Sequence, residues 1–419
     1  MAAPGRFQAR RDAVPDRRAC RETIYPSMIL GAGCAGLSLA WNLLERDVRE
    51  PILVVDRRER FENDRTWCFW DAEPTPFSDL ASHSWTRWMV HDGRREVVAS
   101  CPAIRYLRVR SADFYRRVLD RLAAAPNVTL ALGRPILDVR ETGRGVTVAT
   151  AEGEFRGLQA FDSSARVAPR VPTTLRSPRG GPSLLQHFFG QTIRVDRATF
   201  DPSHATLMDF RASQADGPHF VYLLPLSTTE ALVENTYLFP FDAAPDRHRR
   251  EIAAYLRLRY DLDPKSYEVL EEESGAIPMT MNPGTTATRR ITPIGLAGGG
   301  ARPSSGYAFL RIQRQARWLA DQIAAGDRPG PEELRRSLGP PKYRFFDAVF
   351  LKTLADRPDL APTIFARMFA RTEPAALVRF LSERSTIPDD LRIVAALPKI
   401  PFMAAAVRSI PDWLSRQLW

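Results

Sequence analysis

Three glycines near the start of the chain have the spacing of a dinucleotide phosphate site. Gly31, Gly33 and Gly36 lie between a short apolar run and a stretch whose apolar residues have helical spacing. In such a strand, turn and helix, the first glycine permits the tight turn and the second lets a pyrophosphate approach the backbone. The third lets the helix pack close to the strand, and the N–H groups at the helix start bind phosphate oxygens. Asp56, at the end of the next apolar run, is expected to bind the ribose hydroxyls. A purely structural turn is the alternative.

A second glycine-rich strand end indicates which dinucleotide is bound. Gly298, Gly299 and Gly300 lie far from the first turn, as in flavin enzymes whose FAD-binding lobe is completed late in the chain, so they favour FAD over NAD. We expect a helix over 306–325, whose N-terminus these glycines would bring close to the isoalloxazine ring to stabilise negative charge at its N1/C2 edge. An ordinary glycine loop is the alternative.

Two further stretches are unusual in composition. Residues 64–70 read Asp-Arg-Thr-Trp-Cys-Phe-Trp, and aromatic residues at this density fill a core more often than they contact a ligand. Residues 232–238 form a strand-like run that contains a carboxylate, Glu234. Alternation places Glu234 on one face with Leu232 and Thr236, opposite Val233, Asn235 and Tyr237. From the pattern alone, an acid on an exposed strand face is the usual explanation.

The elements that position these residues alternate between strands and helices at the start of the chain and are mainly strands further along. We expect a helix over 111–125, with Ser111 as its N-cap, and a helix over 246–260. Strands are expected at 128–132, 136–140, 146–151, 191–195, 205–210, 220–225 and 231–238. The proline- and glycine-rich stretch at 165–182 is expected to cross between two lobes, and the chain after 331 is helical and broken by prolines.

The fold class that follows is α/β, with a Rossmann-like FAD-binding domain, a β-sheet substrate lobe and a helical C-terminal region. We assign 24–165 and 290–330 to the FAD-binding domain, 166–289 to the substrate lobe and 331–419 to the helical region. Residues 1–23 are expected to be a disordered leader, since they hold six arginines and no apolar core of the kind a secretory signal needs.

Composition indicates the cellular compartment of the protein and the kinds of partner it could bind. The 419 residues are 44% hydrophobic, and no run of 18 apolar residues indicates a membrane span. The four cysteines, Cys20, Cys34, Cys68 and Cys101, have no CxxC spacing and no histidine cluster beside them. They predict neither a metal site nor a disulfide framework, and a reducing cytoplasm is expected. The net charge of +10 is spread along the chain, which leaves nucleic acid and anionic lipid as candidate partners.

Taken together, seven motifs in order resemble the bacterial lycopene β-cyclases and their plant relatives, a family whose FAD domain is similar to those of p-hydroxybenzoate hydroxylase and geranylgeranyl reductase. The motifs are the 31–36 fingerprint with Asp56, and the stretches 64–70, 186–190, 207–211, 232–237, 275–278 and 298–307. The resemblance covers nearly the whole chain from Met28 onward.

The resemblance implies a redox-neutral, acid-initiated cyclisation of the ψ-ends of lycopene to β-ionone rings, giving γ-carotene or β-carotene. It makes Glu234 the expected acid, with burial raising its pKa, and it places Asp209 and Arg211 among the catalytic residues, although a structural ion pair explains those two as well. The family usually has a second acid after this glutamate, where this chain has Asn235, so we expect retained but altered activity.

The resemblance also implies reduced FAD, with NAD(P)H as an external reductant, and adds Arg65 to the cofactor site. Cation–π stabilisation or core packing is expected of Trp67, Phe69, Trp70 and Tyr307, and the substrate pocket is assigned to these four with Tyr237. No metal is expected.

A C40 hydrocarbon substrate resides in the bilayer, so we expect a cytoplasmic protein attached peripherally to the inner face of the cell membrane. Apolar runs at 393–397 and 400–407, flanked by Arg392, Lys399 and Arg408, fit an anionic membrane surface, with packing of these helices on the sheet as the alternative.

Other functions stay open at this point. A monooxygenase or polyprenyl reductase of the same fold would turn over electrons, but such enzymes commonly carry a Gly-Asp pair where this chain has three glycines. A non-catalytic carotenoid-binding flavoprotein is a third possibility. Nucleic acid is not expected, because no DNA- or RNA-binding module appears.

Overall fold

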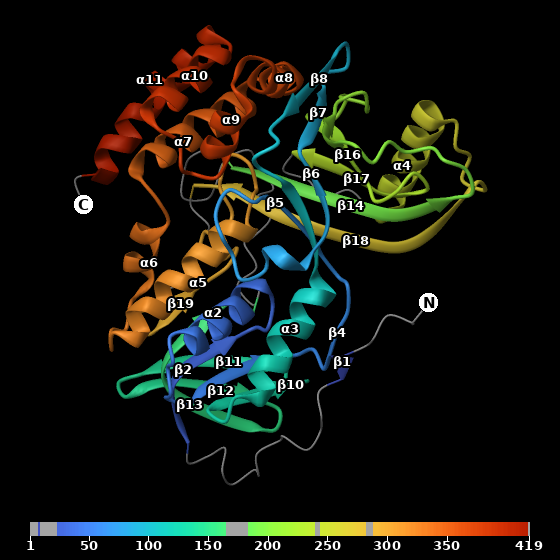
Figure 1. The fold of residues 1–419 in the computed structure, drawn as a ribbon. Helices are drawn as coiled ribbons and strands as arrows, with labels where there is room; N and C mark the ends of the chain where they lie inside the picture. Colours follow the sequence, from blue (N-terminus) through green and yellow to red (C-terminus); the bar gives the residue numbers. More distant parts are fainter. Residues whose placement is uncertain (1–6, 9–22, 165–182, 239–243, 282–287, 418–419) are drawn as a thin grey trace.

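The computed structural model describes residues 7–8, 23–164, 183–238, 244–281 and 288–417. They form one body around a first sheet, a second body around a larger sheet, and a group of C-terminal helices (Figure 1). The leader expected at 1–23 lies outside the described residues except for residues 7–8 and Thr23. The crossing expected at 165–182 lies outside them entirely.

The first sheet has the strand order β10-β3-β2-β13-β12-β11, with β19 also paired to β13. Its strands are β2 (Ile24–Leu30), β3 (Ile52–Asp56), β10 (Val128–Leu132), β11 (Ile136–Thr142), β12 (Gly145–Thr150), β13 (Gly153–Asp162) and β19 (Ile291–Pro293). Helices α2 (Cys34–Glu45), α3 (Ser111–Ala124) and α5 (Phe309–Ala324) share an apolar core with this sheet. β3 is buried along its whole length, as expected of a parallel strand covered on both faces. The short strand β1 (Phe7–Gln8) pairs with β4 (Arg60–Phe61).

The second sheet has the order β18-β14-β17-β16-β15-β7-β8 and is mostly antiparallel. Its strands are β7 (Arg87–His91), β8 (Glu96–Ser100), β14 (Ser183–Val195), β15 (Ala205–Asp209), β16 (His219–Pro225), β17 (Glu230–Leu238) and β18 (Tyr267–Thr280). Helix α4 (Pro245–Tyr260) packs on one face through an apolar cluster. Strands β7 and β8 come from within the range 24–165, so that segment also contributes to the second sheet; the domain boundaries remain predictions.

A small third sheet, with the order β5-β9-β6, lies near the other face of the second sheet. Its strands are β5 (Thr66–Trp70), β6 (Ala81–Trp85) and β9 (Tyr106–Arg110), and the 3₁₀ turn η2 (Ser78–Leu80) precedes β6. Alternation divides β5 between two cores: Phe69 belongs to the core of the first sheet and Trp70 to that of the second. The third sheet therefore joins the two bodies.

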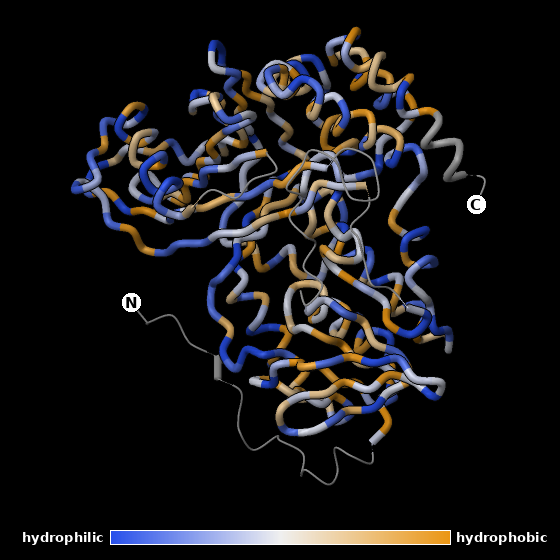
Figure 2. Tube along the Cα trace, turned by 180° about the vertical axis from the view of Figure 1, so that it is seen from behind, coloured by the Kyte–Doolittle hydropathy of each residue, from blue (hydrophilic) through white to orange (hydrophobic). Residues whose placement is uncertain are grey.

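The C-terminal region is helical, as the sequence predicts. Its elements are α6 (Pro331–Ser337), α7 (Pro341–Asp356), η3 (Pro358–Leu360), α8 (Ala361–Arg371), α9 (Pro374–Leu381), α10 (Ile387–Ala396) and α11 (Lys399–Gln417). Most of these helices have proline in the first turn, where its missing N–H costs nothing. Hydrophobic and hydrophilic segments alternate along these helices (Figure 2). In the described part of the chain, no helix combines the length and the apolarity needed to cross a bilayer.

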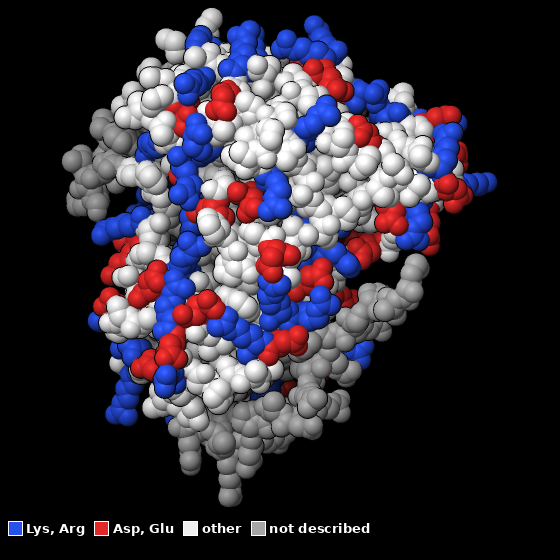
Figure 3. Space-filling view, viewed as in Figure 1, with Lys and Arg blue, Asp and Glu red and all other residues white. Residues whose placement is uncertain are grey.

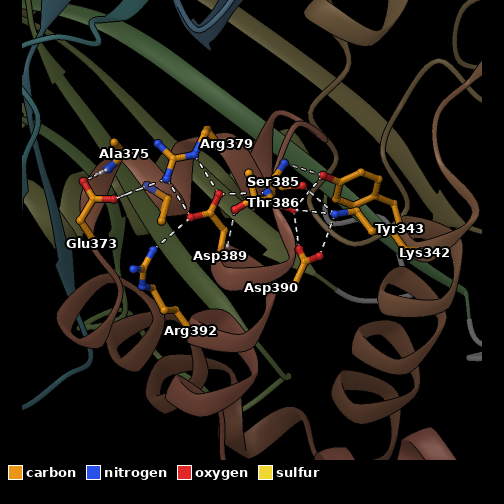
Figure 4. Close-up of polar contacts among 11 residues, drawn as sticks. Lys342, Tyr343, Glu373, Ala375, Arg379, Ser385, Thr386, Asp389, Asp390 and Arg392 are labelled. Carbon is orange, nitrogen blue, oxygen red and sulfur yellow. Dashed lines mark hydrogen bonds and ion pairs between the residues drawn. The ribbon is translucent and has the colours of Figure 1, made fainter.

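Ion pairs hold the C-terminal helices together (Figure 4). Arg379 of α9 donates to both carboxylate oxygens of Asp389 in α10, at 2.7 and 2.8 Å. Lys342 of α7 pairs with Asp390 of the same helix α10, at 2.7 Å. The buried Arg302, from the segment after the second glycine turn, pairs with Asp347 of α7 at 3.0 Å. That segment thereby attaches the helices to the rest of the protein.

Candidate active site

The first glycine turn has the geometry that close approach of a phosphate requires. Gly31 has a φ of +98°, and its N–H donates to the Val55 carbonyl at 2.7 Å. A Cβ on Gly36 would lie 1.9 Å from the Gly31 carbonyl oxygen, so only glycine permits this contact. Gly33 caps α2 without a side-chain hydrogen bond, and no acid lies in the first turn of the helix. The helix N-terminus therefore keeps unpaired N–H groups for an anion.

Asp56 lies at the end of β3, beside this turn. Its carboxylate accepts a hydrogen bond from the Ala32 N–H at 2.6 Å and one from the Arg58 N–H at 2.8 Å. The Arg58 guanidinium donates to the Ala32 carbonyl at 2.8 Å and so lies along the turn. The Arg58 side chain also donates to both oxygens of Asp56, at 3.2 and 3.3 Å, so the roughly four acceptor positions of the carboxylate are filled and a ribose hydroxyl would replace one of these longer contacts. Arg58 was not singled out by the sequence argument, although its place two residues after the acid was visible.

The second glycine turn packs against the first. A Cβ on Gly295 would lie 2.8 Å from Cβ of Ala35, at the start of α2. A Cβ on Gly298 would lie 2.3 Å from the Pro293 carbonyl oxygen, and the Gly298 carbonyl accepts from Gln315 of α5 at 3.2 Å. The helix expected at 306–325 after Gly298, Gly299 and Gly300 is α5, found within three residues of the predicted bounds. It begins at Phe309, and an irregular segment carrying Arg302 lies between the glycines and the helix.

Glu234 stands in a row of residues that crosses four strands of the second sheet. It pairs with Tyr222 of β16 and with Gly190 of β14, and Gly190 pairs in turn with Glu273 of β18. The Thr236 hydroxyl donates to Glu234 at 3.2 Å, as predicted for residues that share a face. Glu234 is half-buried on the face that carries Leu232, away from α4, so it is not an exposed surface acid.

The third sheet supplies the groups that face this row. Cys68 and Trp70 of β5 pair in register with Arg108 and Tyr106 of β9. Tyr307 comes from the segment after the second glycine turn and packs edge-on against Trp70, with ring centroids 5.2 Å apart. Tyr307 also hydrogen bonds with Tyr222 and Tyr106. These groups place aromatic rings and hydroxyls near Glu234.

Burial controls the titration of the site. Desolvation and the nearby Glu273 carboxyl raise the pKa of Glu234 to about 8, against a weaker opposing effect of the Thr236 hydroxyl. Desolvation also raises the pKa of Glu273, while hydrogen bonds from Thr66 and the charges of Arg108 and Arg65 oppose that rise. Burial raises the pKa of Cys68 as well, so its thiol stays protonated.

Several residues predicted for the site lie elsewhere. Asp209 is fully buried on the α4 face of the sheet, where it accepts from Tyr255 at 2.8 Å and from Arg211 at 2.7 Å. Asp209 and Arg211 therefore form a structural ion pair and do not reach Glu234. Tyr237 also faces α4, with its ring stacked on His219 at 4.0 Å, because adjacent strand residues point to opposite faces.

The aromatic residues predicted for the substrate pocket also separate into two groups. Trp70 and Tyr307 lie beside the row that holds Glu234. Trp67 packs on Phe114 and Phe309, with centroids 5.1 and 5.6 Å apart, and Phe69 stacks on Phe309 at 4.6 Å. Trp67 and Phe69 thus fill the core between α3 and α5.

Asn235, which replaces the expected second acid, faces α4 as well. Its amide donates to Glu251 at 2.8 Å and contacts His248 at 2.9 Å, and its carbonyl contacts His219. The second carboxyl beside Glu234 is instead Glu273. Sequence reasoning missed it, along with Tyr222, Tyr106 and Arg108. The available signal was the Gly275–Pro278 motif two residues after Glu273.

Arg65 is exposed and directly precedes β5. Its backbone N–H donates to the Ser111 hydroxyl at 3.0 Å. Ser111 was predicted as the N-cap of α3, but its hydroxyl contacts Asp64 and Arg65, and Arg110 takes the cap position without a side-chain hydrogen bond. The charge of Arg65 acts on Glu273.

A glycine turn on a parallel sheet, a late second turn and a large antiparallel sheet define a class of flavoprotein folds. Two solved structures share this architecture. The geranylgeranyl bacteriochlorophyll reductase-like protein of Thermoplasma acidophilum is 14% identical with a TM-score of 0.58, covering 93% of this chain and 99% of that one. The p-nitrophenol 4-monooxygenase of Pseudomonas putida is 15% identical with a TM-score of 0.59, covering 89% and 98%. The predicted fold class is confirmed.

Within that class, the chain belongs to the lycopene cyclase protein family, whose model matches residues 27–407. One relative is the lycopene beta-cyclase of Pseudescherichia vulneris, which is 26% identical over 410 residues. The alignment covers 92% of this chain and 98% of the relative. The resemblance drawn from the seven motifs is confirmed.

Proposed function

We propose that the protein is a lycopene β-cyclase that closes the ψ-ends of lycopene into β-ionone rings by acid catalysis. The observation that carries this proposal is the placement of Glu234, a half-buried carboxyl between two sheets whose pKa burial raises to about 8. The family relationship and the names of its relatives support it.

The reaction needs a protonated acid, a space without water and stabilisation of positive charge. A proton is added at C2 of the terminal double bond, the cation at C1 is attacked by the C5=C6 bond, and a proton is lost from C6, so no electrons are gained or lost overall. Glu234 donates the first proton, because its raised pKa keeps it protonated near neutral pH. Trp70, Tyr106 and Tyr307 surround the site with rings that exclude water and favour a nearby cation.

The cofactor we propose is FAD in its reduced form, with NAD(P)H as the external reductant. The residues fit it: the turn at 31–36 and α2 would hold the pyrophosphate, Asp56 the ribose, and the turn at 298–300 the flavin end. Reduced flavin would supply negative charge that stabilises the cation. The protein's own contribution is to position these two turns, which the contact between Gly295 and Ala35 fixes.

A route for the hydrocarbon substrate leads from the C-terminal helices. A cavity of about 220 Å³ lies between α7, α8, α9, α10 and α11 and is almost entirely apolar. Its lining includes Ser304 and Ser305, close in sequence to Tyr307 of the site. The lining also includes Val394 and Met403, two exposed apolar residues. We therefore place the protein peripherally on the cytoplasmic face of an anionic membrane, with lycopene entering between α10 and α11.

The central test is Glu234→Gln, expressed in cells that accumulate lycopene. We expect ring formation to fall by about 100-fold or more, because glutamine cannot donate the proton. FAD content should be unchanged, since Glu234 lies on β17 of the second sheet, whereas the turn at 31–36 that would hold the pyrophosphate follows β2 of the first. Glu230→Gln is the matched control: Glu230 lies on the same strand and pairs with Arg194 at 2.8 Å. Appreciable β-carotene from the Glu234 variant would disprove the acid assignment.

A redox function is the second candidate, because the p-nitrophenol monooxygenase has this fold at a TM-score of 0.59. The two functions differ in electron balance. A cyclase needs reductant only to keep its flavin reduced, whereas a monooxygenase or polyprenyl reductase consumes NADPH in step with product. Equal amounts of NADPH oxidised and carotenoid formed would favour the redox function. Carotenoid binding without turnover would instead indicate a non-catalytic flavoprotein.

A further inference from the structure

Glu234 and Glu273 lie on either side of a glycine in the second sheet. We propose that Glu273 is a positioning residue whose ionised carboxylate, held across Gly190 from Glu234, keeps Glu234 in its proton-donating form. This inference rests on the proposed function, because it gives the acid of that reaction a partner. It replaces the second acid that the sequence argument sought at position 235.

The register of three strands brings the two carboxyls together. Gly190 of β14 pairs with Glu234 of β17 on one side and with Glu273 of β18 on the other. A Cβ on Gly190 would lie 3.3 Å from Cγ of Glu273 and 3.5 Å from Cβ of Glu234. Because directly paired residues in a sheet project from the same face, no side chain separates the two carboxyls.

The surroundings of Glu234 and Glu273 differ, and the difference indicates which of the two carboxyls is ionised. Glu273 accepts hydrogen bonds from the Thr66 side chain and backbone, and the cations Arg108 and Arg65 lie near it. Arg108 is only 3% exposed, and its Nε has no hydrogen-bond partner among the described residues, so its charge is poorly screened by water. Glu234 accepts only from the Thr236 hydroxyl among its resolved contacts. Glu273 is therefore the better carboxylate and Glu234 the better acid.

The other titratable groups around the pair do not carry charge at neutral pH. Cys68 faces it from β5, Tyr106 from β9, Tyr222 from β16 and Tyr307 from the segment before α5, and burial raises the pKa of each. Glu273 is accordingly the negative charge that raises the pKa of Glu234 beyond the effect of burial. Without it, Glu234 would lose its proton at lower pH.

The test follows the titration of Glu234 directly. In infrared spectra of the purified protein, the band of a protonated carboxyl that is absent in Glu234→Gln belongs to Glu234. We expect the midpoint of this band to fall by about one to two pH units in Glu273→Gln, because a like charge is removed. The alkaline limb of the cyclisation rate on lycopene in liposomes should move to lower pH by the same amount.

Two further variants make the result specific. Glu273→Asp keeps the negative charge and should return the pH midpoint of the Glu234 band most of the way to its wild-type value. A merely structural role for the side chain would not do this. Glu272→Gln is the matched control, because Glu272 is the next residue, lies on the opposite face and pairs with Arg249 at 2.7 Å.

The outcomes separate this inference from the proposed function. If the Glu234 midpoint is the same in Glu273→Gln as in the wild type, the inference is overturned while the role of Glu234 stands. If the wild type forms no rings, the proposed function fails, and if Glu234→Gln still forms them, the acid assignment fails. In both cases the infrared midpoints still decide whether the two carboxyls are coupled.

Discussion

At the scale of single residues, the direction in which a side chain projects decides its role. Glu234 and Asn235 are neighbours in the chain, yet one faces the third sheet and the other faces α4. Asn235 is fully buried and satisfies Glu251, His248 and His219. An amide is suited to this position because it donates and accepts at once, whereas a carboxylate only accepts. The chain can therefore lack an acid at 235 without losing one from the site.

This argument predicts the behaviour of Asn235→Asp. An oxygen would replace the amide nitrogen that donates to Glu251, so two carboxylates would face each other there, and we expect the free energy of unfolding to fall by about 1–3 kcal/mol at neutral pH. Urea denaturation followed by circular dichroism measures this loss. Cyclisation per folded molecule should stay within about twofold of the wild type, because the side chain lies on the far face of the sheet. A large loss of activity in a variant of normal stability would place Asn235 in the chemistry.

At the scale of elements, strands with a clear apolar pattern could be predicted from the sequence. A strand whose acids pair with arginines from other segments could not. β10 was predicted at its observed bounds, and β16 and β17 within one residue at their starts. β18 was missed because it carries a run of acids from Glu271 to Glu273. Arg110 and Arg249 compensate two of these acids, and they come from segments far away in the chain.

Pairing of an arginine with an acid also makes the contact between α9 and α10 sensitive to low pH (Figure 4). Hydrogen bonds from Arg379 hold the pKa of Asp389 well below its usual range. A depressed pKa in the folded state contributes stability above the unfolded value of about 3.9, and this contribution is lost as the pH falls below it. We expect Asp389→Asn to be less stable than the wild type at neutral pH, and the difference to shrink below about pH 4. Thermal unfolding across this range measures it; a gap that stays constant with pH would contradict the assignment.

At the scale of the whole molecule, the site exists only because three sheets and a late segment meet. The sequence predicted the fold class, while the roles assigned to the two glycine turns and to Glu234 stay predictions. It could not predict Glu273 as the partner, because 38 positions of chain intervene and only the pairing of β14 with both β17 and β18 brings the two together. It also assigned Asp209 to the site because motif membership carries no information about which face of a strand a residue occupies.

The last prediction concerns helices α10 and α11. Ile387, Leu391 and Val394 on α10 are exposed at intervals of four and three residues, and Ile400, Met403, Val407 and Ile410 form a similar stripe on α11. Arg392, Lys399 and Arg408 lie beside these stripes, and on the face shown in Figure 3 basic side chains gather over the C-terminal helices. Apolar stripes flanked by cations are suited to an anionic bilayer surface.

Flotation with acidic liposomes tests this surface on the intact protein. We expect the wild type to float, and to float less at high salt because screening weakens the electrostatic part of binding. Each apolar side chain that enters the bilayer contributes about 1.5–3 kcal/mol, so Met403→Glu should reduce binding by at least about tenfold. Leu258→Glu is the matched control, because Leu258 is 74% exposed on α4, outside the C-terminal helices. Wild-type protein that stays at the bottom of the gradient, or equal losses in the two variants, would show that α10 and α11 do not bind the membrane.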